Sequence, residues 1–212
     1  MMKTDDLIAV LAKDTTQTRF VSAAVVLAVL VPICLAGTLL LLRIGVRHDL
    51  GRAVMAPLVV WKWLLPFLLA SAGLTLALAL SRPESRPRAA LWGMAAVALV
   101  AAALFGLRAV VVPQADWAMA IKGYTVRACL TAITSMGLCG LICGLAVLRR
   151  GATTRPRLSG LAIGLASGGA AALVYALHCN QDDPMFYVVW YGAAILALGL
   201  IGAAAGRRVL AM

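Results

Sequence analysis

Six long apolar segments, separated by short polar stretches, dominate the pattern of residues along this chain. Each segment has the roughly 20 predominantly apolar residues that an α-helix needs to cross the hydrocarbon core of a bilayer. The pattern therefore predicts an all-α fold, a six-helix transmembrane bundle over residues 20–206, with short tails at 1–19 and 207–212. The predicted spans are 20–42, 54–80, 89–112, 128–148, 158–177 and 186–205.

The distribution of Lys and Arg predicts the orientation of this bundle. Most of the 19 Lys and Arg residues lie in the two tails and in the loops 81–88 and 149–157. Basic residues stay on the cytoplasmic side of a membrane, so we expect both termini to be cytoplasmic, in a bacterial inner membrane. The outer side then receives the loops 43–53, 113–127 and 178–185.

Composition agrees with a membrane protein. The chain of 212 residues is 63% hydrophobic and only 13% charged, with a mean hydropathy of +0.98, which is too apolar for a soluble domain. Its net charge of +11 is spread over short loops, where it serves orientation and contact with anionic lipid. The sequence has neither a basic stripe with interleaved aromatics nor a zinc-finger spacing, so we do not expect direct nucleic-acid binding.

Glycines recur at four-residue spacing in three of the predicted helices. Gly160, Gly164 and Gly168 follow this pattern in the fifth span, and pairs at 140 and 144 and at 202 and 206 repeat it. Small residues at this spacing let helix backbones approach closely within lipid. The pattern predicts a compact bundle, with a homodimer contact as the alternative use of the same glycines.

Two of the five cysteines are candidates for a chemical role. Cys34, Cys139 and Cys143 lie inside predicted spans, where a cysteine usually packs as a small apolar residue. Cys129 begins the fourth span and Cys179 follows the fifth, so the predicted orientation places both thiols at the outer surface. Such a pair can form a disulfide, bind a soft cation as thiolates, or be oxidised. A permanent disulfide joining the two helices fits the spacing equally well.

Further metal-ligating side chains flank Cys179. His178 precedes it, and Asp182 and Asp183 follow in the same loop. Imidazole, thiolate and carboxylate can together bind a metal ion, although a histidine at a helix end more often faces solvent or a carbonyl group. We expect no permanent cofactor, and the one ion considered is a transient heavy metal at Cys129 and Cys179.

Two basic residues lie inside apolar runs. Lys62 lies between two tryptophans in the second span, and Arg108 lies near the outer end of the third. A charge at membrane depth needs a partner or a route to water. Arg108 can extend to the interface, whereas we expect Lys62 to face a wet vestibule or to reach an outer carboxylate. The candidate carboxylates are those of Asp116, Asp182 and Asp183.

The amino-terminal tail has the pattern of a short amphipathic helix. It offers an N-cap, an acidic first turn and then apolar residues at helical spacing. Such a helix lies on a membrane surface or enters the groove of a partner. The residues are Thr4, Asp5 and Asp6 for the first turn and Leu7, Ile8 and Leu11 for the apolar stripe.

Several stretches resemble the NrsF-type anti-sigma factors, and the likeness spans nearly the whole chain. One departure is Met136-Gly137 after Ser135, where the family pattern has a proline close by. The matching stretches are Met2 to Ile8, the loop Gly45 to Leu50, the lysine after Trp61, the run Leu148 to Pro156, and Tyr175 to Cys179 followed by Phe186 to Tyr191.

The resemblance implies a polytopic inner-membrane protein that holds an extracytoplasmic-function sigma factor and frees it under heavy-metal or oxidative stress. It implies two functional cysteines, matched here by Cys129 and Cys179. The residues already singled out near the outer side, His178, Asp182, Asp183, Lys62 and Arg108, are our own auxiliary candidates for this sensor. The resemblance also implies a sigma-contacting segment at the cytoplasmic amino terminus. That segment corresponds to Lys3, Thr4, Asp5, Asp6, Leu7, Ile8 and Leu11.

Other classes of protein fit parts of the pattern. An enzyme is not expected, because the spans hold no carboxylate pair and the chain has no HExxH motif and no glycine-rich phosphate loop. A small-ion or metal transporter would share the six helices and the intramembrane lysine, but it would need polar residues through both leaflets, and here they gather toward one side. A membrane assembly subunit is the third class.

Overall fold

The computed structural model describes residues 22–81, 87–151, 153 and 155–210. The predicted sigma-contacting residues of the tail therefore lie outside the described residues. Over the described ranges the chain is helical and contains no strand. The elements are α2 (Ser22–Ile44), α3 (Leu50–Met55), α4 (Pro57–Leu80), α5 (Arg88–Val111), the 3-10 turn η1 (Gln114–Asp116), α6 (Trp117–Lys122), α7 (Val126–Leu148), α8 (Pro156–Ala176) and α9 (Pro184–Val209).

The all-α fold predicted from hydropathy is confirmed, since α2, α4, α5, α7, α8 and α9 are each long and apolar enough to cross a membrane. Helices α4, α8 and α9 start two or three residues away from the predicted positions, and each begins at a proline. Pro57, Pro156 and Pro184 occupy the first turn of α4, α8 and α9. Proline suits that position because the missing N–H has no partner within the helix there, and hydropathy alone does not register it.

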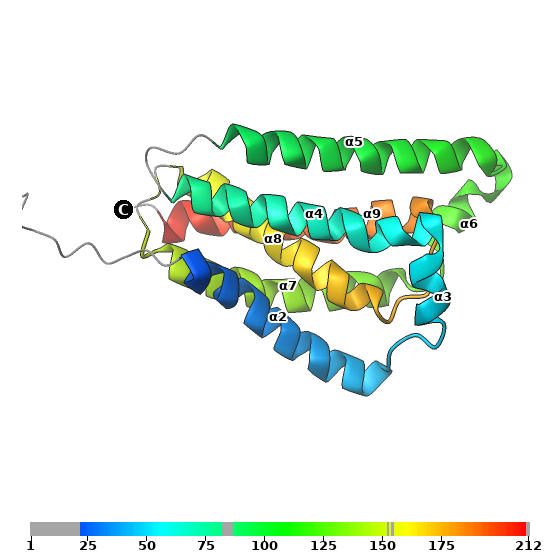
Figure 1. The fold of residues 1–212 in the computed structure, drawn as a ribbon, viewed down its shortest axis with the longest axis horizontal. Helices are drawn as coiled ribbons and strands as arrows, with labels where there is room; N and C mark the ends of the chain where they lie inside the picture. The colour runs from blue at the N-terminus through cyan, green and yellow to red at the C-terminus, as the bar shows by residue number, and fades with distance from the viewer. Residues whose placement is uncertain (1–21, 82–86, 152, 154, 211–212) are drawn as a thin grey trace, which may run out of the picture.

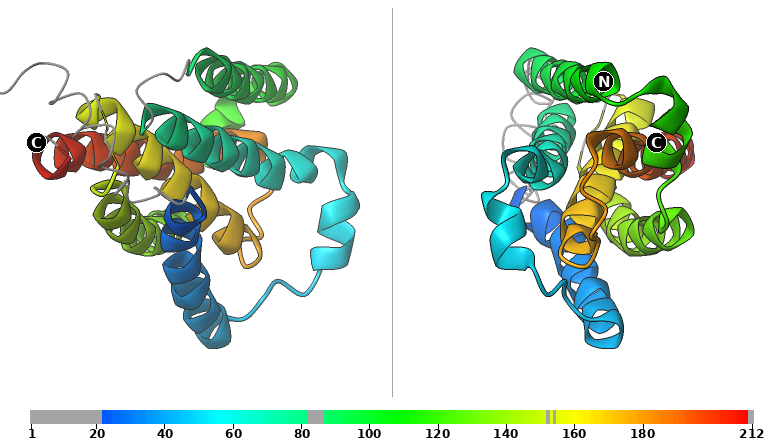
Figure 2. Two further views of the ribbon diagram at one scale, coloured as in Figure 1. Left: turned by 60° about the vertical axis from the view of Figure 1, so that its left-hand side comes forward. Right: turned by 90° about the vertical axis from the view of Figure 1, so that its right-hand side faces the viewer.

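The long helices run the length of the bundle, so the described chain begins and ends at the same end (Figure 1). We call this the terminal end. The short helices α3 and α6, which the hydropathy pattern did not predict, lie at the opposite end together with the connection from α8 to α9 (Figures 1 and 2). Both termini were predicted to lie on one side of the membrane, which requires an even number of long helices. Which side of the membrane that is stays a prediction.

Helix α8 is the centre of the bundle. It packs against α4, α7 and α9, and 78% of its most apolar stretch is buried. Glycines make these contacts close: a Cβ at Gly164 would lie 2.8 Å from the Cα of Gly199 in α9, and one at Gly73 of α4 would lie 2.8 Å from the carbonyl oxygen of Ala162. The predicted small-residue pattern therefore serves packing within the chain, and the glycines considered for a homodimer contact are already occupied.

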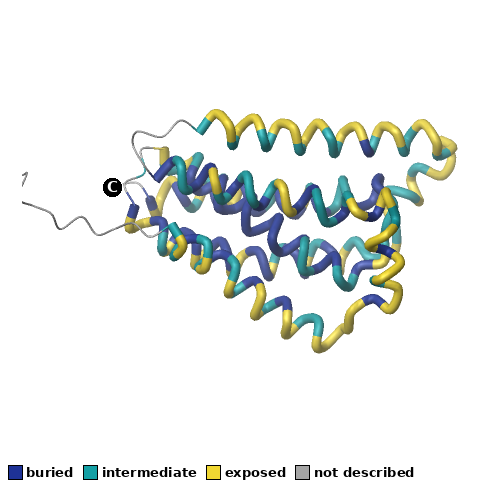
Figure 3. Tube along the Cα trace, viewed as in Figure 1, coloured by how far each residue is buried: buried dark blue, intermediate teal, exposed yellow. Residues whose placement is uncertain are grey.

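Helix α5 lies at the edge. Leu104 is its one buried residue, and the helix packs mainly along α4 and α9 (Figures 2 and 3). An apolar helix with so little buried surface needs an apolar solvent around it, as lipid would provide.

Candidate functional site

A cluster of charged side chains lies at the end of the bundle opposite the termini. It consists of Arg47, Asp49, Lys62 and Asp182, and we call it the polar cluster. Arg47 lies in the loop after α2 and holds Asp182 with two bonds of 2.7 Å, from Nη1 to Oδ1 and from Nη2 to Oδ2. Its Nε also donates to Asp49 Oδ1 at 2.7 Å. The guanidinium fork matches two carboxylates at once, so the α2–α3 loop is fastened to the α8–α9 loop.

Lys62 enters the same cluster from α4 and is completely buried. Its Nζ donates to Asp182 Oδ1 at 3.0 Å and to the backbone carbonyl oxygen of Cys179 at 2.5 Å. Arg47 Nη1 donates to that same carbonyl oxygen at 3.1 Å. A buried ammonium is tolerated only with such partners. Of the partners expected for Lys62 from the sequence, the structure selects Asp182.

The two carboxylates balance the two cations, and their pKa values reflect this. Partial burial disfavours the charged form of Asp182, but the hydrogen bonds from Arg47 and the charge of Lys62 outweigh it, so its pKa is lowered. The hydrogen bond from Arg47 lowers the pKa of the exposed Asp49 to about 2. Bonds to Asp182 and Asp49 raise the pKa of Arg47. Arg47, Asp49 and Asp182 therefore stay ionised at physiological pH.

Three smaller contacts fasten the surrounding elements. Arg108, in the last turn of α5, donates from Nε to Asp183 Oδ2 at 3.0 Å. Asp183 also caps α9, because its Oδ1 accepts the backbone N–H of Met185. His178 Nδ1 lies 2.9 Å from the carbonyl oxygen of Gly45, whose φ of +80° suits glycine. Each auxiliary residue predicted near Cys179 thus has a structural partner.

The predicted cysteine pair lies just beneath the polar cluster. Cys129 and Cys179 are free thiols that lie near each other, and Lys62 lies near Cys129. Both are buried, with exposed fractions of 0% and 2%, whereas the sequence placed them at the surface. The correction has a simple cause: Cys129 faces the core from the first turn of α7, and the cluster holds the backbone of Cys179 inward.

Two tyrosines complete the surroundings of the thiol pair. The rings of Tyr175 and Tyr191 lie 6.2 Å apart, and both residues interact electrostatically with the two cysteines. The hydroxyl of Tyr191 faces the side chain of Cys179 and makes no hydrogen bond of ordinary geometry with another described residue. Such a hydroxyl can donate to a sulfur that gains negative charge.

The stretch around Cys179 does not assemble as a metal site of three or more ligands. Among the described residues no three His, Cys, Asp or Glu side chains approach closely enough to hold an ion. The carboxylates of Asp182 and Asp183 are bound to cations instead, and His178 faces a carbonyl group. Two-thiol binding of a soft cation stays a prediction. Cys34, Cys139 and Cys143, expected to pack inside the bundle, are exposed on α2 and α7.

Sequence reasoning missed Arg47, Asp49, Tyr175 and Tyr191. Arg47 was counted only as a loop charge, because nothing in spacing connects it with Asp182, 135 residues away. The two tyrosines look like ordinary apolar positions of α8 and α9. The signal that could have found all four is the family resemblance, because the matching stretches Gly45 to Leu50, Tyr175 to Cys179 and Phe186 to Tyr191 contain them.

Fold and site together define an apolar bundle of six potential membrane helices with a charged, thiol-containing interior at one end. The family model NrsF, described as a negative regulator of sigma F, matches residues 11–211. The chain therefore belongs to the NrsF family, which is a family of regulators and not of enzymes. The resemblance found in the sequence is confirmed, and it favours the regulator over the transporter and the assembly subunit.

Two curated relatives match along their whole length. The chain is 38% identical to a protein of Caulobacter vibrioides named Anti-sigma-F factor NrsF, and the match covers 99% of each chain. It is 33% identical to a protein of Azospira oryzae named Probable anti-sigma-F factor NrsF, again with 99% of each chain covered. No solved structure matches this chain.

Proposed function

We propose that this protein is an integral inner-membrane anti-sigma factor that holds an extracytoplasmic-function sigma factor and releases it on heavy-metal or oxidative stress. Family membership and the names of both relatives support the anti-sigma function. The six apolar helices support a membrane location. The sensor is the pair Cys129 and Cys179, in the end of the bundle that faces away from the cytoplasm.

The observation that carries the sensor proposal is the position of Cys179. Its thiol lies in the buried pair, while its own carbonyl oxygen accepts bonds from Arg47 and Lys62. A soft cation such as Cd²⁺ binds the two sulfurs as thiolates and displaces two protons. Alternatively, hydrogen peroxide takes two electrons from the two thiols, which leaves one disulfide and two molecules of water. Either event changes the sulfur–sulfur geometry and so displaces the backbone that the cluster holds.

We assign binding of the sigma factor to the amino-terminal tail. Its apolar stripe, Leu7, Ile8 and Leu11, enters a groove of the sigma factor, with Lys3, Thr4, Asp5 and Asp6 forming the first turn. Exposed arginines at the terminal end agree with a cytoplasmic location under the positive-inside rule. They are Arg149, Arg150, Arg155, Arg157, Arg207 and Arg208.

A signal of this kind acts through the difference in sigma affinity between two states of the bundle. Coupling between sites is typically about 1–3 kcal/mol, or roughly 5- to 150-fold in affinity. Release is therefore graded with the dose of metal or oxidant. Complete release requires that the Kd of the resting complex lies only moderately below the cellular concentration of the sigma factor.

The test joins binding and induction in one strain. For binding, the detergent-solubilised full chain and a variant that lacks residues 1–15 are each purified with the cognate sigma factor. For induction, sigma-dependent transcription is measured after cadmium chloride or hydrogen peroxide is added. Deletion of the tail should abolish the complex, and Cys129→Ser or Cys179→Ser should abolish induction. Cys139→Ser, an exposed thiol of α7, is the matched control and should induce normally. Normal induction in both sensor variants would overturn the proposal.

A further inference from the structure

Lys62 has more partners at the thiol pair than its structural role needs. It reaches Asp182 and the carbonyl oxygen of Cys179 from α4, and its charge also acts on Cys129 of α7. Arg47 already bonds the same carboxylate and the same carbonyl oxygen. The α8–α9 loop would therefore remain held without Lys62. What Lys62 adds is a direct connection between that loop and α4.

Helix α4 lacks a backbone hydrogen bond at Pro66, one turn after Lys62 along the chain. Pro66 lies inside the helix and has no N–H, so the backbone carbonyl of Lys62 lacks its usual helical donor. Below this point α4 is locked to α8: a Cβ at Gly169 of α8 would lie 2.7 Å from the carbonyl oxygen of Pro66 and 3.0 Å from the amide nitrogen of Ala70. The turn at Pro66 therefore divides α4 into two segments. The upper segment, residues 57–65, lies toward the polar cluster, and the lower segment lies toward the terminal end and is fixed to the central helix.

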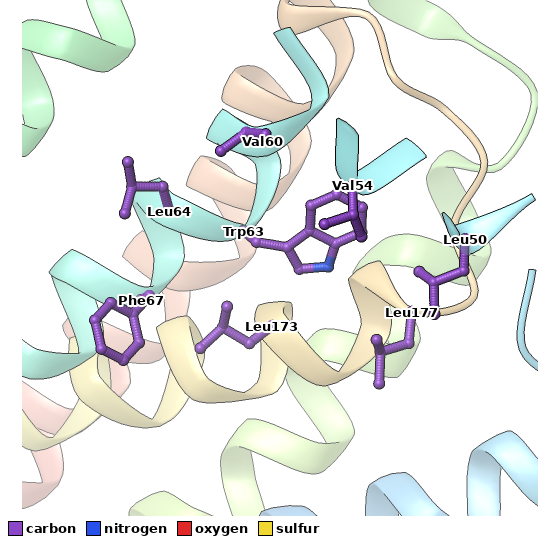
Figure 4. A pocket seen from close by; sticks show the side chains of 8 residues that line it. All are labelled: Leu50, Val54, Val60, Trp63, Leu64, Phe67, Leu173 and Leu177. Atoms are coloured by element: carbon purple, nitrogen blue, oxygen red, sulfur yellow. The ribbon is translucent and has the colours of Figure 1, made fainter. Parts of the chain in front are cut away.

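The upper segment of α4 borders open space. An apolar groove of about 470 Å³, open to the outside of the bundle, lies between α3, α4 and α8, and its walls include Val54, Val60, Trp63, Leu173 and Leu177 (Figure 4). Trp63 follows Lys62 directly and projects into the space, with its buried indole N–H unpartnered among the described residues. Close-packed interiors resist motion, whereas residues 57–65 have few protein atoms on the side of this groove to clash with when they tilt.

We propose that Lys62 is the positioning residue that transmits the state of the thiol pair to α4, with Pro66 as the hinge. The inference rests on the proposed function as a cysteine sensor. A change at Cys179 moves its carbonyl oxygen. The ammonium of Lys62 follows, because its hydrogen-bond partners among the described residues are this oxygen and Asp182 of the same loop, and residues 57–65 tilt into the groove. Because α4 contacts α8 closely from Pro66 onward, the tilt acts on the central helix at Gly169 and reaches the terminal end through the two helices together.

The test uses Lys62→Met in the full-length protein with its sigma factor. Methionine has a similar length and no charge, and it leaves the Arg47–Asp182 pair intact. Two quantities are measured across a series of cadmium chloride concentrations: sigma-dependent transcription, and protection of Cys129 and Cys179 from alkylation by N-ethylmaleimide. Lys122→Met, in α6 at the same end of the bundle and outside the polar cluster, is the matched control.

The expected result is a separation of the two readouts. In Lys62→Met the thiols remain protected by cadmium while induction falls about tenfold, within the range of one coupling interaction, and transcription without cadmium stays repressed. Lys62→Arg should restore part of the induction. An induction curve equal to wild type would overturn the proposal. Release without cadmium would overturn it too, because Lys62 would then restrain α4 instead of moving it.

Two further comparisons keep the result interpretable. If Lys62→Met does not accumulate, Lys62→Arg alone decides: a displaced cadmium dose supports the proposal, and an unchanged dose overturns it. Cys179→Ser is measured in parallel. Normal induction in Cys179→Ser means that the sensor proposal fails, whereas a block in Cys179→Ser with normal induction in Lys62→Met means that only the role of Lys62 fails.

Discussion

Arg47 and Asp182, 135 residues apart in the chain, form a two-pronged ion pair in which each carboxylate oxygen lies 2.7 Å from a guanidinium nitrogen. The pair joins the loop after α2 to the loop before α9, and the side chain of Arg47 is only 4% exposed. Buried pairs of this kind contribute little compared with apolar packing, but the loss of one partner is costly because the other charge stays buried. The loss of a partner of a buried charge in the polar cluster should therefore destabilise the fold.

The first prediction concerns Asp182→Asn. The substitution leaves Arg47 and Lys62 as two buried cations with only the exposed Asp49 opposite. We expect the free energy of unfolding to fall by about 3 kcal/mol, the lower part of the range for breaking a buried pair, since Asp182 is itself 27% exposed. Unfolding by SDS in mixed micelles measures this. Asp49→Asn is the control and should change little, and equal losses in the two variants would contradict the argument.

The second prediction is a loss of stability in acid. The folded-state pKa of Asp182 is lowered from its usual 3.8, and that of Asp49 is lowered to about 2. A carboxyl group with a lowered folded pKa stabilises the fold fully above its unfolded pKa and loses that contribution as the pH falls through the folded value. Stability in detergent should therefore be flat for these groups above about pH 5 and fall between roughly pH 4 and 2. Asp182→Asn should flatten that fall; a fall of the same size would show that other groups cause it.

The helices could be predicted because hydropathy directly encodes which segments tolerate lipid. The contact of Lys62 with Asp182 was also foreseeable, since a buried ammonium requires a carboxylate and few lie at that end. The pairing of Arg47 with Asp182 was not, because it depends on how two loops meet. Burial of Cys129 was missed because the first turn of a predicted helix looks like surface until its side chain is seen to face the core.

The third prediction concerns the close contact of α8 with α9. A Cβ at Gly164 would collide with the backbone of Leu198 and lie 2.8 Å from the Cα of Gly199. Backbone atoms cannot turn aside as a side chain does, so Gly164→Ala should separate the helices and reduce stability by about 1–3 kcal/mol. Gly192→Ala in α9 is the matched control, because a Cβ there has nothing within 4 Å. Thermal unfolding in detergent compares them, and a Gly164→Ala variant as stable as Gly192→Ala would contradict the packing.

The last prediction separates stability from metal binding at the thiol pair. The Tyr191 hydroxyl faces Cys179 without an ordinary hydrogen bond, so Tyr191→Phe removes no bond in the resting protein and should leave the unfolding free energy unchanged or slightly higher. When a metal converts Cys179 to a thiolate, the hydroxyl gains an acceptor. The variant should therefore bind cadmium about tenfold more weakly, as expected for loss of a group that supports a ligand.

Tyr187→Phe supplies the contrast for this measurement. The Tyr187 hydroxyl donates to the carbonyl oxygen of Leu58 at 3.0 Å, away from the sulfurs. Its loss should cost about 1 kcal/mol of stability and leave cadmium affinity as in wild type, measured by calorimetric titration of the purified protein. If both variants bind cadmium as wild type does, the hydroxyl of Tyr191 does not serve the thiolate, and the cysteines bind the ion without its help.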